Sequence, residues 1–114
     1  MSESLRVDLD ALLVSGVPWK PFRAGIEIHS LYGELGVGRS AALLRYAPGA
    51  VLPAHRHVGF EQILVLEGAQ VDEHGRYAKG MLVVNAPGSG HSVHSPEGCI
   101  VFVTWDNPVE FQST

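Results

Sequence analysis

The sequence predicts a small all-β barrel, because three of its features favour short strands over helices. Thirteen glycines and seven prolines in 114 residues supply many turns. Valine, isoleucine, tyrosine and phenylalanine, which fit the pleated surface of a sheet, recur between those turns. The length accommodates one domain and leaves no room for a second folding unit of ordinary size. We therefore expect a single all-β sandwich or barrel.

The order of strands follows from apolar alternation between turn signals. Ile26 and Ile28 alternate with polar neighbours, as in a half-buried strand. Residues 63–66 and 99–105 are apolar on both faces, so one face fills the interior and the other requires cover. A second sheet or another subunit would supply that cover, and a homodimer is the simplest expectation. We expect strands at 22–32, 40–46, 51–57, 60–66, 80–84 and 99–105, a hairpin tip at 73–75, and a short closing segment at 106–114.

The N-terminal residues are expected to form an arm at 1–18, followed by the barrel at 19–114. Four leucines within the first thirteen residues recur at helical spacing, but the run is too short to predict a helix. We expect instead an arm docked on the barrel or on a neighbouring subunit. The prolines of the segment VPWKPF bias it towards extended geometry.

Charge and composition exclude several partners. Eight Lys and Arg against twelve Asp and Glu give a formal charge of −4, and Arg39, Arg45 and Arg56 are spread out, so no nucleic-acid partner is expected. No apolar run is long enough to span a membrane, so no membrane partner is expected either. The acidic first residues do not resemble a secretory signal, and the single cysteine, Cys99, cannot form an internal disulfide. We therefore expect a cytoplasmic protein.

The stretch GAVLPAHRHVGFEQILVLEG, residues 49–68, carries the candidate functional site. Residues two apart on a strand point to the same face, so His55 and His57 can converge while Arg56 faces away. Glu61 follows at a fixed offset, and His91 lies further on in the turn-rich run PGSGH. Imidazoles and a carboxylate at one point suit a divalent transition metal. The His-x-His pair alone is weak evidence, since surface strands carry such pairs by chance, and the other residues give it weight.

The spacing of this stretch resembles the first motif of the cupin superfamily. Gly49, five residues, His55-x-His57, three residues, Glu61, six residues and Gly68 reproduce that motif without a gap. The resemblance implies the cupin barrel, a single RmlC-like double-stranded β-helix, also called a jelly roll. It also implies that the two histidines and the glutamate bind a metal ion.

A second stretch resembles the second cupin motif, with two departures. Gly80, Gly88 and His91 match at the expected offsets. Ala86 stands where proline is usual, and Ser95 stands where asparagine is usual. The match implies that His91 is the fourth ligand. Four ligands would either close a tetrahedral zinc site or leave positions open on a five- or six-coordinate metal.

Three longer segments resemble one cupin branch in particular. These segments are similar in sequence to the ChrR-like cupin domain, and they read EQILVLEG, NAPGSGHSVHSPEGC and IVFVTW. That domain is the metal-binding C-terminal half of ChrR-type anti-sigma factors, and it also occurs as a free-standing protein. The resemblance runs from about residue 19 to 105. It implies the metal ligands His55, His57, Glu61 and His91. The donor set does not select one metal sharply; we expect zinc or iron, with manganese and nickel as alternatives.

The remaining histidines and the cysteine are expected to be structural or solvated. On a strand His94 would face away from His91, His74 falls in the hairpin tip, and His29 is expected to be exposed. Cys99 is expected to be a small buried hydrophobe. Four further residues are expected to pack in the core, where they could line a pocket: Tyr46, Phe60, Met81 and Trp105.

Two functions are consistent with the sequence. The first is an enzyme in which the metal acts on a small organic molecule, with dioxygenase-like chemistry leading because this branch also resembles metal-dependent dioxygenases that cleave diketones. The second is a non-catalytic, metal-stabilised sensing or regulatory module. ChrR-type proteins hold a sigma factor through an N-terminal zinc domain, which the twenty or so residues before the barrel do not provide, so direct anti-sigma action is not expected. The enzyme is favoured, although no catalytic residue is identified beyond the ligands and Glu61 could act as a base instead of a ligand.

Overall fold

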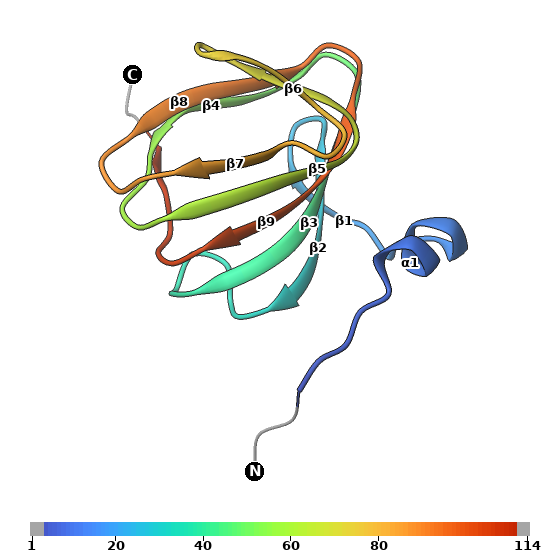
Figure 1. Ribbon diagram of the computed structural model, residues 1–114. Helices are drawn as coiled ribbons and strands as arrows, with labels where there is room; N and C mark the ends of the chain where they lie inside the picture. Colours follow the sequence, from blue (N-terminus) through green and yellow to red (C-terminus); the bar gives the residue numbers. More distant parts are fainter. Residues whose placement is uncertain (1–3, 112–114) are drawn as a thin grey trace.

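The protein is a curled antiparallel β-sheet preceded by a short helix (Figure 1). The computed structural model describes residues 4–111. Ten strands lie within that range, and the all-β barrel predicted from the sequence is confirmed. The elements are α1 (Leu9–Ser15), β1 (Lys20–Arg23), β2 (Ile26–Tyr32), β3 (Ser40–Tyr46), β4 (Ala50–Arg56), β5 (Glu61–Asp72), β6 (Gly75–Ala78), β7 (Leu82–Asn85), β8 (Gly90–Ser95), β9 (Cys99–Trp105) and β10 (Glu110–Phe111).

Strand β5 joins the two halves of the barrel, which are β1-β2-β3-β9 with β7 on one side and β8-β4-β10 with β6 on the other. The strand order is β1-β2-β3-β9-β5-β8-β4-β10, and β6 and β7 also pair with β5. The first part of β5 pairs with β9 and β7, whereas its last residues pair with β6 and β8. The change occurs at a register shift between Val65 and Glu67, followed by Gly68 at a φ of +72°. A Cβ at Gly68 would lie 2.1 Å from the carbonyl oxygen of Gly98, so the bend requires glycine.

The core lies between the two halves of the barrel and is built from the inward-facing residues of each strand. Val65, Val101 and Val103 are almost completely buried, and the alternation of burial along β9 follows the two-residue period of a strand. Val103 is the cross-strand partner of Ile63, and Val101 that of Leu44. Burial of these aliphatic side chains provides the main stabilisation of the barrel.

The predicted strands agree with the structure where the apolar pattern is continuous. Strands β3 and β9 have the predicted bounds, and β4 and β7 begin one and two residues from the expected positions. The predicted strand at 22–32 is wrong as a single element, because Gly25, at a φ of +73°, turns the chain between β1 and β2. Strand β5 continues to Asp72, and the strands β6 and β8 were not predicted, because glycines there indicated turns. The closing segment contains β10, and residues 112–114 lie outside the described range.

The N-terminal segment contains a helix instead of only the expected arm. The backbone N–H of Ala11 donates a hydrogen bond of 3.0 Å to the carboxylate of Asp8, which caps the first turn. Gly16, at a φ of +108°, ends the helix. These two caps stabilise a helix of seven residues that apolar spacing alone did not predict. The division into an arm at 1–18 and a barrel at 19–114 stays a prediction.

Part of the outer face is apolar and exposed. Leu82 and Val84 on β7 are each about half exposed, at 54% and 55%. Leu64, the β5 partner of Leu82, is partly buried. The predicted homodimer would cover this face, and it stays a prediction. Within the described chain, no helix has the length and apolar character needed to cross a membrane.

Candidate metal centre

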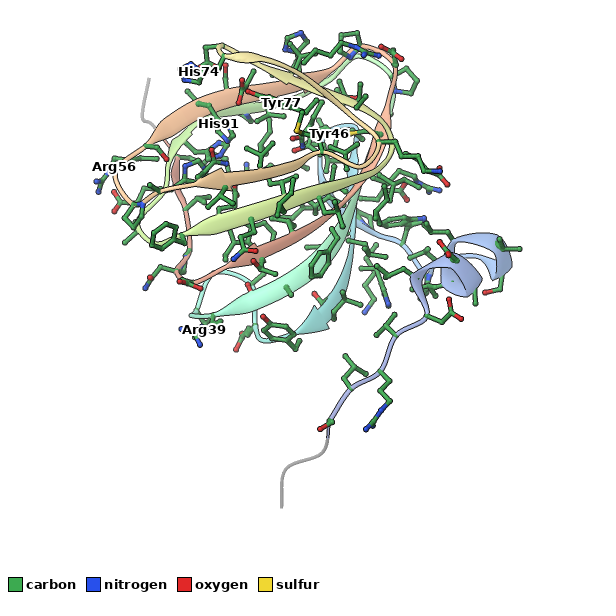
Figure 2. The ribbon with its side chains drawn as sticks, viewed as in Figure 1. Arg39, Tyr46, Arg56, His74, Tyr77 and His91 are labelled. Carbon is green, nitrogen blue, oxygen red and sulfur yellow. The ribbon has the colours of Figure 1, made fainter. Side chains whose placement is uncertain are left out.

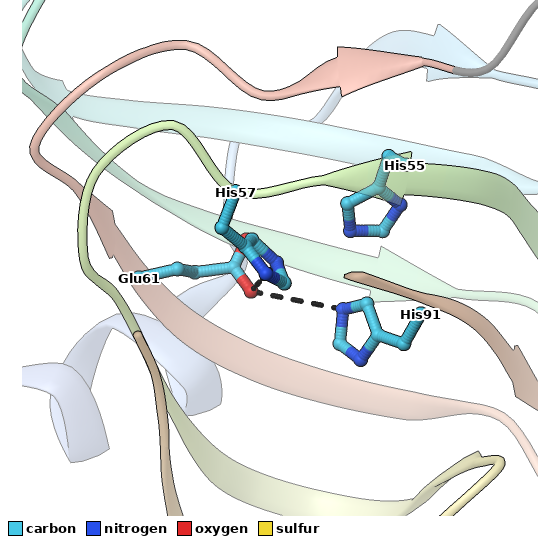
Figure 3. Close-up of side chains that lie close together, drawn as sticks. All are labelled: His55, His57, Glu61 and His91. Atoms are coloured by element: carbon cyan, nitrogen blue, oxygen red, sulfur yellow. Dashed lines mark ion pairs between the residues drawn. The ribbon is translucent and has the colours of Figure 1, made fainter. Parts of the chain in front are cut away.

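The four predicted ligands come from three strands and from the residue after β4, and they lie together inside the barrel (Figure 3). His55 is on β4 and His91 is its cross-strand partner on β8. Glu61 begins β5, and His57 follows β4 directly, with its backbone N–H bonded to the carbonyl oxygen of Ser89 at 2.8 Å. All four side chains are buried, and one potential ligand atom from each lies within 4.8 Å of the others.

Each of the three histidines is held through its Nδ1 atom. The Nδ1 of His55 lies 2.9 Å from the carbonyl oxygen of Pro53. The Nδ1 of His57 lies 3.1 Å from the carbonyl oxygen of Ser89 and 3.0 Å from its hydroxyl. The Nδ1 of His91 lies 3.0 Å from Oδ2 of Asp72. Because carbonyl and carboxylate oxygens only accept, each Nδ1 carries the proton, and Nε2 is the free ligand atom in the neutral ring.

Two of the three Nε2 atoms have no hydrogen-bond partner among the described residues. Nε2 of His57 and of His91 are buried and accept no hydrogen bond from any described residue. Nε2 of His57 lies 3.0 Å from Oε1 of Glu61, and Nε2 of His91 lies 3.9 Å from the same oxygen. A lone pair and a carboxylate oxygen at this separation repel each other unless a proton or a cation lies between them. Buried polar atoms aimed at a common point therefore fit a metal ion.

Glu61 is held as a carboxylate by neighbours on two strands. The indole N–H of Trp105 donates to Oε2 at 2.6 Å, and the amide of Asn85 donates to Oε1 at 3.0 Å. Burial by itself would raise the pKa of Glu61, but the neighbouring His57 and His55 rings and the indole bond of Trp105 outweigh it and leave the pKa below its usual value. The residue is therefore ionised and oriented, as metal binding requires.

His55 is poised in its neutral form. Burial lowers the pKa of the ring below its usual value, and the bond to the Pro53 carbonyl and the charge of Glu61 only partly offset that effect. Neutral imidazole is the form that binds metal ions. Burial disfavours the charged ring of His55, and it thus favours the neutral imidazole, which can bind a metal ion.

A hydrogen-bonded chain fixes His91 from behind. Asp72, at the end of β5, accepts from Nδ1 of His91 through one oxygen. Its other oxygen accepts from the Tyr77 hydroxyl and from the backbone N–H of His74, each at 2.8 Å. Figure 2 shows His91 inside the barrel and Tyr77 and His74 towards the hairpin above it. This series of hydrogen bonds is the carboxylate–histidine arrangement that orients metal-ligating histidines in proteins.

His55, His91 and Glu61 line a cavity of about 250 Å³. Its walls are mostly aliphatic and aromatic side chains, including Val93, Val101 and Trp105. Tyr46 and Gln70 are buried polar residues that also line it. Burial and the charge of Glu61 raise the pKa of Tyr46 far above its usual value, so the phenol keeps its proton and is a donor, not a base. The cavity is smaller than pockets for drug-sized ligands, which measure roughly 300–1,000 Å³, and suits a small organic molecule.

The other residues singled out from the sequence lie away from the cluster, except for two that line the cavity. His74 and His94 are exposed, as predicted, and His29 is partly buried. Cys99 is buried, and burial raises the pKa of its thiol, as expected for an inert side chain. Tyr46 and Trp105 belong to the core and line the cavity as predicted. Phe60 and Met81, which were expected in the core, are instead 47% and 48% exposed.

The residues that support the ligands were not identified from the sequence. Asp72 and Asn85 are ordinary turn-forming types beside predicted turns, and no spacing links them to the histidines. Ser95, at the position where the second cupin motif has asparagine, is fully buried and donates to the carbonyl oxygen of Ala69 at 2.6 Å. The departure from the motif therefore retains a hydrogen bond that ties β8 to β5.

Solved structures with the same fold include three informative examples. An RmlC-like cupin protein from Ralstonia eutropha has 19% identity and a TM-score of 0.76, with 84% of this chain and 67% of that chain covered. An acetylacetone dioxygenase from Acinetobacter johnsonii has 15% identity and a TM-score of 0.79, covering 99% and 79%. The complex of Rhodobacter sphaeroides SigE with the anti-sigma ChrR has 29% identity and a TM-score of 0.70, covering 82% and 50%. This chain therefore spans half the length of the chain it matches in that complex.

The two likenesses below 25% identity show the fold, which is the cupin barrel predicted from the motifs. No curated protein matches the sequence. The ChrR cupin-like domain family matches residues 10–109, and this range includes both motifs and all four residues of the buried cluster. The chain belongs to the ChrR cupin-like domain family, and its buried His55, His57, Glu61 and His91 form a cluster that could hold a metal ion.

Proposed function

We propose that this protein is a metal-dependent enzyme that acts on a small organic molecule inside the barrel, with dioxygenase-like chemistry. His55, His57, Glu61 and His91 would hold one divalent transition metal ion, zinc or iron in the first place. The observation that carries the proposal is the pair of buried Nε2 atoms of His57 and His91, which face Glu61 without hydrogen-bond donors while the Nδ1 atom of each of the three histidines is occupied. Such an arrangement is stable when a cation satisfies all four ligand atoms.

The bound ion would supply Lewis-acid or oxygen-activating chemistry at the cavity. The protein's own part is to hold the ligands in place and to keep the cavity dry. Trp105 and Asn85 fix both oxygens of Glu61, and the aliphatic walls exclude water around any small molecule that enters. Tyr46 keeps its proton, so it can donate a hydrogen bond to an oxygen atom of the bound molecule.

The dioxygenase-like version rests on chemistry and on a likeness in fold. The acetylacetone dioxygenase of Acinetobacter johnsonii matches 99% of this chain. A donor set of nitrogen and oxygen with no thiolate is compatible with iron, and an apolar cavity is compatible with a small diketone. A β-diketone is therefore the first substrate class to test.

The alternative is a metal-stabilised sensing module, and one observation favours it. Among the described residues that line the cavity, none outside the four proposed ligands is a free acid or base at neutral pH, because Tyr46 stays protonated and the remaining polar groups are neutral or cationic. A site without a proton-transfer group would suit recognition as well as reaction. The likeness to the SigE–ChrR complex makes a regulatory ligand the natural form of this alternative.

The test combines metal content with oxygen uptake. The protein is purified without added metal or chelator, its metals are measured by elemental analysis, and oxygen uptake is followed with acetylacetone and related diketones. Iron near one per chain with substrate-dependent uptake supports the enzyme, whereas stoichiometric zinc without uptake supports the sensing module. His55→Ala and His91→Ala should lose the metal, and His94→Ala, an exposed residue on the same strand as His91, is the matched control. Unchanged metal content in both ligand variants would refute the site.

A further inference from the structure

The mouth of the cavity carries one arginine, Arg23, that forms no ion pair with any residue the structure describes. Arg23 ends β1 and lines the same cavity as His55, Glu61 and His91. Within residues 20–111, every other arginine forms an ion pair with a carboxylate, whereas Arg23 forms none. The paired residues are Arg39, Arg45, Arg56 and Arg76.

Aromatic stacking holds this guanidinium in place. The Cζ atom of Arg23 lies 3.7 Å from the centre of the Phe111 ring and 5.5 Å from that of Phe22. The Phe111 ring in turn lies 5.5 Å from the ring of His55, so a single aromatic ring separates the arginine from a proposed ligand. Stacking uses the face of the guanidinium and leaves the N–H donors on its edge free. Those donors match the two oxygens of a carboxylate.

The charge balance of the cavity also favours an anion. Among the lining residues that the structure describes, Glu61 is the one acid and Arg23 the one permanent cation. A divalent ion on the proposed ligands would outweigh the charge of Glu61, so the cavity would be positive in total. The apolar walls and the volume of about 250 Å³ restrict the anion to a small molecule with a compact apolar body.

From this geometry we propose that Arg23 selects a small monoanionic acid, such as a short-chain or aromatic carboxylate, as the molecule that binds in the cavity. The proposal rests on the proposed metal site, because it concerns the substrate or ligand of that site. The apolar body would lie against the walls of the barrel, and the carboxylate would lie at the mouth against the edge of Arg23. The inference applies equally to an enzyme and to a sensing module.

The test compares an acid with its neutral amide. Binding of benzoate and of benzamide to the protein as purified is measured by titration calorimetry, together with metal content. We expect the wild type to bind benzoate at least roughly tenfold more tightly than benzamide, and Arg23→Gln to remove most of that preference while benzamide affinity is kept. Arg23→Lys should restore part of the preference for benzoate, since lysine keeps the charge but lacks the paired N–H donors of the guanidinium. The control is Arg45→Gln, which alters an arginine stacked on Trp19 and paired with Glu27. It should change the affinity for neither benzoate nor benzamide.

Each other outcome has a definite meaning. A preference for benzoate that survives in Arg23→Gln would place the carboxylate on the metal ion and overturn the proposal. Equal or absent binding of the two probes to the wild type would also overturn it. Loss of both probes in Arg23→Gln and in Arg23→Lys would show that Arg23 only closes the mouth through its rings, which again overturns it. Wild-type protein without metal that still prefers benzoate would contradict the proposed metal site alone, so the two failures are distinguishable.

Discussion

Replacement of Asp72 by alanine should weaken metal binding without touching any proposed ligand. The Asp72 carboxylate accepts from Nδ1 of His91 at 3.0 Å, and its side chain is only 5% exposed, so water cannot easily replace it. Without the acceptor, the ring of His91 can rotate or exchange its tautomer, and Nε2 becomes a poorer ligand. Tyr77→Phe removes just one of the bonds that orient Asp72 and should have a smaller effect in the same direction.

The expected size of the effect follows from the role of such supporting carboxylates. Their loss typically lowers metal affinity about 10- to 100-fold. At a fixed metal concentration well above the dissociation constant, this removes roughly 1.4–2.7 kcal/mol of ligand-linked stability. For a domain of this size, the loss corresponds to a fall in the melting temperature of roughly 5–11 °C.

The assay is a competitive metal titration against a chromophoric chelator, with thermal melts at fixed free metal. Glu97→Gln is the matched control, because it removes a carboxylate from an exposed pair with Arg76 that has no contact with the cluster. The control should leave the dissociation constant unchanged. If Asp72→Ala binds metal as tightly as the wild type, the hydrogen-bonded chain does not orient His91 and the reasoning fails.

Three further predictions concern stability and assembly. Trp105→Phe removes the donor to the buried Glu61 carboxylate and should lower the metal-free unfolding free energy by roughly 1–3 kcal/mol in urea; no change would mean that the indole bond is not formed in solution. Gly68→Ala should lower the free energy of unfolding by roughly 1–3 kcal/mol, which is more than Gly36→Ala should. Both glycines have positive φ, but only Gly68 has backbone atoms within 4 Å of an added Cβ, and equal melting temperatures of the two variants would contradict this. Light scattering should give twice the 12.3 kDa chain mass, with Val84→Lys monomeric, since that residue lies on the exposed apolar face; a monomeric wild type would refute the homodimer.

The core of the candidate site was predictable because it is local. His55 and His57 share a face through the two-residue period of a strand, and Glu61 follows after a short link on the next strand. Such spacing survives in one sequence without any knowledge of the fold. Strands β3 and β9 were equally predictable, since their apolar runs are unbroken and turn residues mark their ends.

The supporting residues could not be predicted because a break in alternation hides them. Counting by twos from Glu61 along a regular strand would place Asp72 on the opposite face. The register shift between Val65 and Glu67 reverses that parity, so the last part of β5 turns Gln70 and Asp72 towards the cavity. A bulge depends on the pairing of β5 with β9, which the sequence of β5 does not specify.

The sequence by itself determined that His55, His57 and Glu61 meet, because strand period and a short link act over a few residues, and its resemblance to the second cupin motif added His91. Only the tertiary structure decided how each histidine is oriented and what lies at the cavity mouth. Asp72 reaches His91, and Arg23 reaches Phe111, across strands far apart in the chain. Those contacts depend on which strands pair and in which register, and that choice is made by packing of the whole barrel. The grouping of His55, His57 and Glu61 is therefore a local property of the chain, whereas the position of His91, the protonation of the histidines and the charge facing a bound molecule are properties of the fold.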